Sequence, residues 1–500
     1  MHYLLLFTIF VISTCGLIYE LVAGTLASYL LGDSVTQFST VIGTYLFAMG
    51  IGSYLSKFLR NNLIEHFIRI EVITGVIGGL SSAILFISFG YSGYFRIILY
   101  GLVLLTGIFV GLEIPLIMRI LKNKVGFRDL VSKVFTFDYI GALIASIAFP
   151  MVLVPYLNLT RTSVLFGLFN VGLALYLIYY FRKELKHPTL LFIQASGASL
   201  LLIFAFVYAG RINRISETEI YGESIIYATN SKYQRIVLTR DRNAYSLFLN
   251  NHLQFNSRDE YRYHEALVHP VLSHCSKPKN ILVLGGGDGF AVREILKYPQ
   301  VEHITLVDLD PKLVSIFSKN ELMTKLNQNS LNNPKLKVVH ADAFEWLRNT
   351  AKDKYDAIII DFPDPSNYSV GKLYTLSFYK SLQRVMTNRT LAVMQSTSPL
   401  YAKESFWCIN STIEASYLQT IPYHTYVPSF GEWGYILFGY DLNELKVRSL
   451  PKKLKYYSNE EFKSMKFFPP DMQDHKKVVN RLDNQALIPL FEKEWDSLFD

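Results

Sequence analysis

Cysteine is scarce in this chain, with three residues among 500. Cys15, Cys275 and Cys408 are far apart and form no CxxC pair, so the sequence supports neither a disulfide framework nor a zinc site, and we expect no metal. Charged residues are also few, at 18% of the sequence, while 50% of the residues are hydrophobic. This balance allows two or three domains and indicates a membrane protein.

A basic surface for nucleic acid is also lacking. The net charge is +8, but residues 1–210 hold 13 Lys and Arg against 8 Asp and Glu, mostly in loops beside apolar stretches. We therefore expect no nucleic-acid partner and take the lipid bilayer as a partner instead.

Seven apolar stretches fill residues 1–210, and most are long enough to cross a bilayer core, which takes about 20 helical residues. The first has no basic segment before it and is too long for a cleaved signal, so we keep it as a span. The sequence thus predicts an N-terminal α-helical transmembrane bundle of about seven spans. The stretches are Leu4–Leu31, Gln37–Leu59, Phe67–Phe89, Ile97–Leu121, Phe135–Leu157, Ser163–Tyr180 and Thr189–Ala209.

Four acidic residues, Glu20, Glu71, Glu113 and Asp138, fall inside or at the edge of these stretches. An ionisable side chain at membrane depth is costly, so each is a functional candidate. Two interpretations stay open. The carboxylates line a polar path for a cationic ligand or a proton, or they pair with other groups within the bundle.

The sequence gives conflicting indications of the side of the membrane on which the following domain lies. Basic residues gather in the second, fourth and sixth loops, for example Lys57, Arg119 and Lys183. The positive-inside rule places these loops in the cytoplasm, and seven spans would then leave the next domain outside. Arg211 and Arg214 follow the last stretch, which instead indicates an even number of spans or an atypical topology. We favour an inner-membrane protein whose following domain is cytoplasmic.

A glycine-rich stretch follows in the second half of the chain. Ile281–Leu284 is typical of a buried parallel strand, Gly285–Gly289 of a turn that a ligand can approach, and Ala291–Lys297 of a helix. The next strand, Ile304–Val307, ends at Asp308, whose carboxylate suits a ribose diol. The turn lacks the G-x-G-x-x-G spacing, which disfavours NAD and FAD and favours an adenosine-bearing ligand such as an S-adenosyl compound.

Asp288 is the unusual residue of this turn, because it places a carboxylate where the ligand would lie. A phosphate site would avoid that charge. We therefore expect a ligand that is cationic at this point. The alternative, in which Asp288 only caps the following helix, stays open.

This stretch resembles the signature of spermidine synthases, the polyamine aminopropyltransferases. The resemblance runs from about Tyr227 to Tyr440, and the N-terminal region resembles the membrane-embedded branch of that family. It implies a small β-rich subdomain over residues 211–258, a Rossmann-like domain of the S-adenosylmethionine-methyltransferase type over 259–442, and a C-terminal extension over 443–500. Alternation over Glu217–Arg240 and Tyr245–Phe255 also predicts strands, with a hairpin turn at Asn250-Asn251.

The resemblance also implies roles for individual residues. By the motif Tyr233-Gln234, Gln234 contacts the nucleoside, and by Asp259-Glu-Tyr-Arg-Tyr-His-Glu265, Tyr263 and His264 face the ligand pocket. Asp342 matches the acidic residue beside the adenine amino group and is followed by Ala343. The turn residues Gly285, Gly287 and Asp288, together with Asp308, complete the nucleoside site.

Two further carboxylates define the expected chemistry. Asp361-Phe-Pro-Asp-Pro365 matches the family's Asp-x-x-Asp-Pro. With Asp288, Asp361 and Asp364 would form an acidic pocket for decarboxylated S-adenosylmethionine as co-substrate and for a small-molecule amine, with no cofactor. Asp361 is the expected general base, and 5′-methylthioadenosine would leave. For Asp364, the alternative of a turn carboxylate that caps local amides stays open.

The acceptor amine is left open. Phe430 stands where the soluble enzymes have a tyrosine that meets the polyamine, while Glu432 offers another charge for the distal ammonium. Two other functions also remain, an S-adenosylmethionine-dependent methyltransferase and a polyamine sensor or transporter with an enzyme-like domain. Assembly as a homodimer and as a homotetramer both stay open.

Overall fold

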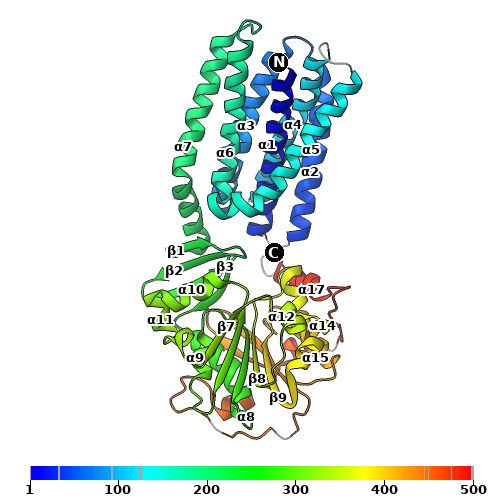
Figure 1. Ribbon diagram of the computed structural model, residues 1–500. Coiled ribbons are helices and arrows are strands. Elements are labelled where there is room, and N and C mark those ends of the chain that lie inside the picture. The colour runs from blue at the N-terminus through cyan, green and yellow to red at the C-terminus, as the bar shows by residue number, and fades with distance from the viewer. Residues whose placement is uncertain are drawn as a thin grey trace. The chain divides into compact units, whose positions relative to one another are not determined.

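The computed structural model describes residues 2–31, 34–91, 94–122, 127–443, 445–448, 450–474 and 476–496. The chain divides into two compact units, Met1–Ile225 and Ile226–Asp500 (Figure 1). Each unit has its own hydrophobic cores, which draw on residues of that unit alone. This division differs from the predicted boundary at residue 210, and the finer domain boundaries stay predictions.

The first unit is built from long apolar helices. Six helical segments are long and apolar enough to cross a membrane by length and composition. The count is six because one run, Asp129–Phe181, spans 53 residues and includes both the fifth and the sixth predicted stretch. The helices are α1 (His2–Leu31), α2 (Ser34–Leu55), α3 (Leu63–Tyr91), α4 (Phe95–Leu121), α5 (Phe127–Ala148), α6 (Val154–Phe181) and α7 (Pro188–Tyr221).

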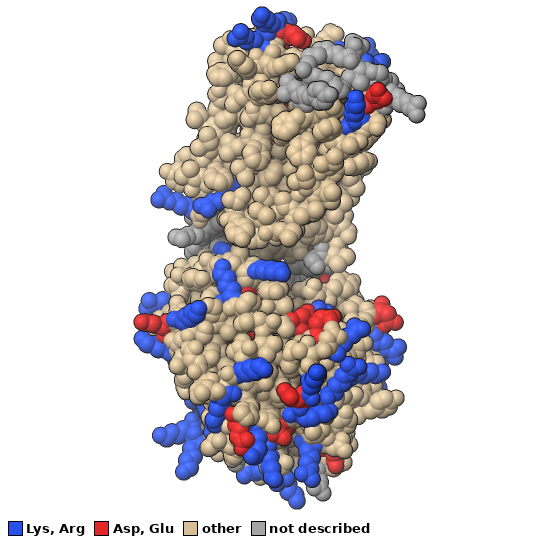
Figure 2. All heavy atoms as spheres, viewed as in Figure 1, with Lys and Arg blue, Asp and Glu red and all other residues tan. Residues whose placement is uncertain are grey.

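The joint between α5 and α6 is a widened helical turn, Phe149–Leu153, followed by a break at Asn158, where φ is 62° and ψ is 173°. Asn tolerates a positive φ better than most residues, so it suits a change of direction here. On the face drawn in Figure 2, a belt of this unit carries no Lys, Arg, Asp or Glu side chain. Such a belt is typical of a surface that faces lipid.

The expectation of strands from Glu217 onward is wrong for its first residues. Helix α7 continues to Tyr221 and ends at Gly222, which has a φ of 62°. A glycine with positive φ is the usual stop for a helix. The predicted hairpin turn is confirmed, since Asn250 and Asn251 both have positive φ. The small sheet has the order β1 (Ser224–Asn230), β2 (Arg235–Asp241), β3 (Ala244–Leu249) and β4 (His252–Asn256).

The second unit is centred on a seven-stranded sheet with the order β10-β11-β9-β8-β5-β6-β7. The predicted strands over Ile281–Leu284 and Ile304–Val307 are confirmed and run in parallel. The strand Tyr355–Asp361 lies on the other side of the first one and is also parallel to it. Strand β11 runs antiparallel to both β9 and β10. The strands are β5 (Asn280–Gly285), β6 (His303–Asp308), β7 (Leu336–His340), β8 (Tyr355–Asp361), β9 (Met386–Gln395), β10 (Gln419–Val427) and β11 (Gly431–Gly439).

Helices cover both faces of this sheet (Figure 1). On one face pack α8 (Glu260–His274), α9 (Phe290–Ile295), α10 (Pro311–Lys319) and α11 (Glu321–Leu326). On the other face pack α12 (Ala343–Asn349), α14 (Leu376–Leu382) and α15 (Lys403–Glu414). The short helix α13 (Tyr368–Gly371) follows β8. The architecture is the α/β methyltransferase-like fold that the sequence predicted.

The chain after β11 is part of this fold rather than a loose tail. Its helices are α16 (Asn459–Ser464) and α17 (Leu487–Asp496). Phe462 and Met465 join the core on one face of the sheet, whereas Leu487 joins the core on the other. The Glu494 carboxylate accepts hydrogen bonds from the backbone nitrogens of Glu404 and Ser405, at 2.6 and 3.0 Å, and so caps α15. Residues 444, 449, 475 and 497–500 of the predicted extension lie outside the described residues.

Candidate active site

The carboxyl ends of the parallel strands bring the predicted acidic residues to one edge of the sheet. Gly285, at the end of β5, is the register partner of Asp361, at the end of β8. On the other side of β5, strand β6 ends at Asp308. Open α/β sheets bind ligands at this edge. The structure therefore brings the turn, Asp308 and Asp361 together.

Glycine is required in the turn because neighbouring atoms leave no room for a side chain there. A Cβ atom on Gly285 would lie 2.2 Å from the backbone oxygen of Asp361, and one on Gly287 would lie 2.7 Å from the Asp308 carboxylate. Gly285 also has a φ of 78°, where a side chain is strained. The turn therefore passes directly against both acidic strand ends.

Asp361 accepts a hydrogen bond from the Tyr263 hydroxyl, which donates to Oδ1 at 2.7 Å. Tyr263 comes from α8 and is 7% exposed. Burial raises the pKa of the Asp361 carboxyl, although the charge of His264 and the Tyr263 hydrogen bond oppose the rise. A carboxylate with a raised pKa is a better proton acceptor than one in water.

Asp288 is electrostatically coupled to the same group. Burial raises the pKa of Asp288 to about 6, His264 opposes the rise, and the charge of Asp361 adds to it. Asp288 Oδ1 also accepts the backbone N–H of Phe290 at 3.0 Å. Asp288 therefore does cap the following helix, as the alternative predicted. The same carboxylate also lies close enough to Asp361 for their charges to interact.

His264 is buried behind these two carboxylates. Its Nδ1 lies 2.8 Å from the Glu260 carbonyl oxygen and 3.0 Å from a Glu260 carboxylate oxygen. Burial alone would lower the pKa of His264, but the hydrogen bond to Glu260 and the charges of Glu260, Asp288 and Asp361 raise it instead. His264 thus lies near Glu260 and both carboxylates, and a contact between His264 and a ligand stays a prediction.

Asp308 is the acidic residue expected at the ribose. It is 8% exposed, and burial raises its pKa to about 6, against the effect of the backbone N–H groups of Asp310 and Gly287. The Asp310 nitrogen donates to Asp308 Oδ1 at 2.8 Å. Gln234, expected at the nucleoside, donates from Nε2 to Asp310 Oδ2 at 2.9 Å. Gln234 thus connects the small sheet to the loop after β6.

The predicted adenine residue has structural partners in this chain. Asp342 caps α12 by accepting the backbone N–H groups of Phe344 and Glu345, and its other oxygen pairs with Lys372 Nζ at 2.6 Å. The next residue, Ala343, is buried at the start of α12. Both Asp342 oxygens therefore have partners within the chain. A direct contact between Asp342 and the adenine base stays a prediction.

Asp364 follows Asp361 on the loop after β8, and the end of β9 surrounds it. Gln395 Nε2 and the Thr397 hydroxyl donate to its two oxygens at 3.5 and 3.4 Å. Burial raises the pKa of Asp364 to about 7, although both hydrogen bonds oppose the rise. Gln395 ends β9 and Thr397 lies in the loop after it, so both donors come from outside the turn that holds Asp364. The alternative of a carboxylate that caps amides of its own turn would need donors from that turn.

Phe430 and Glu432 have different surroundings. The Phe430 ring lies 5.0 Å from Trp433 and 5.9 Å from Tyr263, so it forms an apolar wall beside the Asp361 partner. Glu432 instead pairs with His424 Nδ1 at 2.8 Å. Neighbouring residues of a strand point to opposite faces, so Glu432 points away from the face that Trp433 shares with Tyr263. The structure does not bring Glu432 to the carboxylate cluster.

Three further groups, Gln395, Tyr374 and Thr397, lie around Asp364 and its loop. Gln395 Nε2 also contacts the Tyr374 hydroxyl at 3.0 Å, and that hydroxyl donates to the Pro363 carbonyl at 2.9 Å. Thr397 has a φ of 57°, which is unusual for a β-branched residue and marks the loop after β9. Among the residues that the structure describes, no group of three or more His, Cys, Asp or Glu is arranged to bind a metal.

Comparisons with known proteins show which family this chain resembles. Residues 260–446 match the family model described as spermine/spermidine synthase domain. The chain is 50% identical over 493 residues to a polyamine aminopropyltransferase of Leptospira interrogans, which covers 99% of each chain. It is 47% identical over 500 residues to polyamine aminopropyltransferase 2 of Ralstonia nicotianae, with 98% of each chain covered.

A solved spermidine synthase from Thermotoga maritima aligns with 49% of this chain and 85% of its own, at 27% identity and a TM-score of 0.45. The curated relatives match along almost the whole sequence, including the helical unit. From this full-length identity and the matched domain, we conclude that the chain belongs to the polyamine aminopropyltransferase family.

Proposed function

We propose that this enzyme transfers the aminopropyl group of decarboxylated S-adenosylmethionine to putrescine or a related amine, giving spermidine and 5′-methylthioadenosine. The observation that carries the proposal is the acidic cluster at the strand ends, in which Asp288 and Asp361 act on each other and Asp364 follows on the same loop. Both reactants are cationic, and a negatively charged crevice favours them over anionic ligands.

The reaction is a displacement at carbon. The neutral amine nitrogen attacks the methylene beside the sulfonium, the carbon–sulfur bond breaks, and its electron pair stays on sulfur. The new ammonium then loses one proton, and we assign Asp361 as the acceptor. Its raised pKa and the Tyr263 hydrogen bond support this role, and a positioned base contributes roughly 10²–10⁴-fold.

The other site residues bind and orient in this proposal. Asp308 and Gln234 order the ribose side, Gly285 and Gly287 let the nucleoside approach the backbone, and Asp342 with Ala343 shapes the adenine side. Alignment of the two reactants adds to the rate of the chemical step.

At the acceptor end, Asp288 and Asp364 bind ammonium groups while Tyr263 and Phe430 form the wall of the groove. Because Glu432 is paired with His424, we no longer place it at the distal ammonium. His264 contributes charge from behind the cluster.

Product identification tests the function. The purified full chain is incubated with decarboxylated S-adenosylmethionine and a panel of diamines and triamines, and the products are identified by mass. We expect an aminopropylated amine together with methylthioadenosine. Ordinary S-adenosylmethionine is the matched control, because its carboxylate would meet Asp288. Methylated products, or a preference for the carboxylated nucleoside, would replace our proposal with a methyltransferase.

We further propose a multi-pass protein of the inner membrane with a cytoplasmic catalytic unit. The six long apolar segments and the uncharged belt in Figure 2 support the membrane part. Protease accessibility in sealed vesicles tests the sidedness, since a cytoplasmic unit is cleaved in inside-out vesicles only. Assembly as a homodimer or a homotetramer stays a prediction that the mass of the purified protein tests.

A further inference from the structure

Two carboxylates lie buried inside the helical unit, away from the transfer chemistry. Glu71 of α3 and Glu113 of α4 are 0% and 1% exposed. Among the described residues, both oxygens of Glu71 and Oε1 of Glu113 have no hydrogen-bond partner. The two side chains are close enough to act on each other electrostatically. Two unpaired negative charges in an apolar interior would be very costly, so the pair needs positive charge.

Polar side chains from two other helices are also buried without partners in the part of the chain that the structure describes. Tyr19 of α1 is 2% exposed, Asn170 of α6 is 0% exposed, and the Tyr19 hydroxyl and both Asn170 amide atoms lack partners among the described residues. Tyr19 is within electrostatic range of both carboxylates. Thr74, one turn along α3 from Glu71, lies beside Glu113. Unpartnered buried groups of this kind mark a site rather than a packed core.

Glycines on α3 bring these groups together. A Cβ atom on Gly78 would lie 2.6 Å from the Tyr19 ring, and one on Gly75 would lie 3.1 Å from Asn170 Cβ. Residues 71, 74, 75 and 78 are three or four positions apart and therefore share one face of the helix. That face presents Glu71 to α1 and α6 at once.

No Lys or Arg neutralises the pair, since no ion pair among the described residues includes Glu71 or Glu113. The other titratable groups near the pair are Cys15, Tyr45 and Glu20. Cys15 of α1 donates to the Phe166 carbonyl at 3.6 Å, and Tyr45 of α2 donates to the Gly16 carbonyl at 2.8 Å. Glu20 acts on Tyr45 and completes the set.

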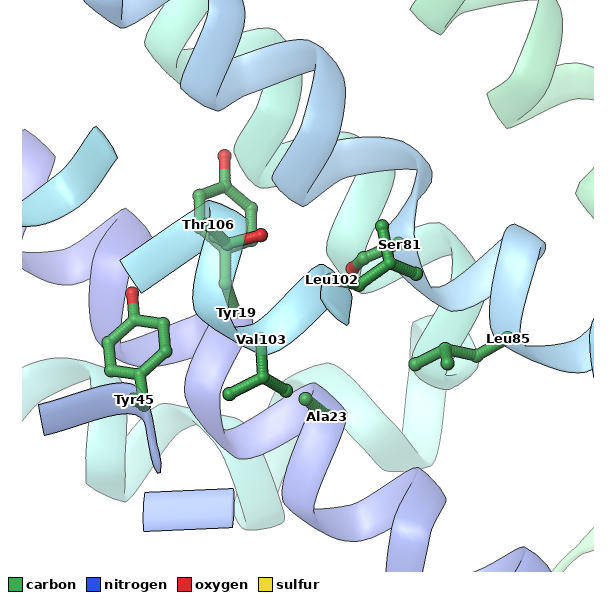
Figure 3. A pocket seen from close by; sticks show the side chains of 8 residues that line it. All are labelled: Tyr19, Ala23, Tyr45, Ser81, Leu85, Leu102, Val103 and Thr106. Carbon is green, nitrogen blue, oxygen red and sulfur yellow. The ribbon is translucent and has the colours of Figure 1, made fainter. Parts of the chain in front are cut away.

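The space beside Tyr19 is small. One cavity of about 10 Å³ is lined by Tyr19, Tyr45, Ser81 and Thr106. Figure 3 shows these side chains. A cavity of this size admits about one water molecule and is too small for a polyamine chain. A proton is the cation that needs no space of its own beside the carboxylates.

We propose that Glu71 and Glu113 form a proton-binding site inside the helical unit, in which one exchangeable proton is shared between the two carboxylates. Tyr19, Thr74 and Asn170 are the neutral hydrogen-bonding groups around the shared proton. When the proton leaves, one O–H bond breaks and its electron pair stays on the carboxylate. The site is independent of the aminopropyl transfer described above.

Infrared spectroscopy of the full chain in detergent tests the site. Near neutral pH we expect the carbonyl stretch of a protonated carboxylic acid, at a lower frequency in D₂O. Replacing one member, as Glu71→Gln or Glu113→Gln, changes the frequency, because an amide then faces the remaining carboxyl. Replacing both removes the band. Asp138→Asn is the matched control and leaves the band in place, because Asp138 lies on α5 outside the pair.

Three further results decide the outcome. If Na⁺, but not choline, removes the band at constant pH, the same proton leaves in exchange for sodium, which supports the site. Other buried carboxyls, such as Asp364, contribute bands of their own, so the native chain and the double variant are compared in a difference spectrum. If that difference spectrum lacks the band of a protonated carboxylic acid, the proposal is wrong. If the double variant does not fold, the native chain is instead prepared with isotope-labelled glutamate. A protonated band that the label does not shift would then show that the proposal is wrong.

Discussion

Burial, rather than neighbouring charge, is the main reason that the pKa values of the active-site carboxylates are higher than those of carboxylates in water. It is the largest contribution to the raised pKa of Asp288, Asp361 and Asp364 alike. Such groups are costly to the fold when they are charged, and they are useful to an enzyme that binds cations and moves a proton. Three predictions follow from individual residues.

Asp361→Asn should lower kcat by roughly 10²–10⁴-fold, because the amide cannot accept the proton of the attacking amine. Binding of the nucleoside should change little, since the Tyr263 hydroxyl can donate to the amide oxygen as well. Steady-state kinetics at saturating nucleoside measure the effect. Asp353→Asn, at the exposed opposite end of the same strand, is the control and should behave as the native enzyme. Unchanged turnover in Asp361→Asn would exclude this base.

Asp364→Asn should weaken amine binding and yet stabilise the fold at high pH. Burial raises the pKa of Asp364 from 3.8 to about 7, so the folded state binds more protons than the unfolded state across that range. Stability therefore falls as pH rises from about 4 to about 7, by up to about 4 kcal/mol. The variant lacks this loss and should melt at a higher temperature at about pH 8. Near pH 4 the two proteins should melt alike, and a difference there would contradict the mechanism.

Thr397 should position Asp364 through its hydroxyl, which donates at 3.4 Å from a backbone with positive φ. Thr397→Ser keeps the donor, so KM for the amine should stay near the native value. Thr397→Ala removes it, and the loss of about 1 kcal/mol should raise that KM several-fold while kcat changes less. Equal KM values for the two variants would show that only the backbone conformation matters.

Among the elements, the turn after β5 decides where the active-site carboxylates lie. Gly285 contacts the Asp361 backbone and Gly287 contacts Asp308, so the turn is packed between two strand ends. A turn this tight leaves no room for even one methyl group at its first glycine.

Gly285→Ala and Gly286→Ala separate contact from backbone strain. Both glycines have positive φ, so both variants should lose roughly 1–2 kcal/mol of stability from strain. At Gly285 the new methyl group would also lie 2.2 Å from a backbone oxygen, whereas at Gly286 it meets the Asp361 side chain at 3.2 Å. We expect Gly285→Ala to be much less stable and nearly inactive. Thermal melting and turnover of both variants measure the difference. If both variants lost stability and activity to the same extent, backbone strain alone would account for the effect.

The elements also show what the sequence could and could not reveal. The parallel strands were predictable because buried apolar runs ended in Gly285, Asp308 and Asp361. The start of the β-rich segment was wrong because Glu217–Tyr221 alternates like a strand, while the helix before it continues until Gly222. Pairing of Asp364 with Gln395 and Thr397 was not predictable, since it depends on a loop more than 30 residues away along the chain. The pairing of Glu432 with His424 was not predictable either, since it joins side chains of two neighbouring strands that no motif links.

At the scale of the whole molecule, the two units have separate hydrophobic cores, one pair of cores for each. A unit with its own core and its own complete sheet can fold by itself. The catalytic residues all lie in the second unit.

A chain that starts at Gly222 and ends at Asp500 should therefore be soluble without detergent and catalyse the same transfer. Its kcat should match that of the full chain, because every group assigned to the reaction is retained. Circular dichroism, melting and turnover measured side by side provide the check. An aggregated or inactive fragment would mean that the catalytic unit needs the helices to fold.

Helix α17 lies at the end of the chain, yet it completes the core beneath α15 and caps that helix through Glu494. The Glu494 carboxylate and the backbone groups that it caps lie 90 and 89 positions apart along the chain. A cleavage between β11 and α17 would therefore turn an intramolecular contact into one between two pieces. Helix α15 would then keep its cap only while both pieces stay associated.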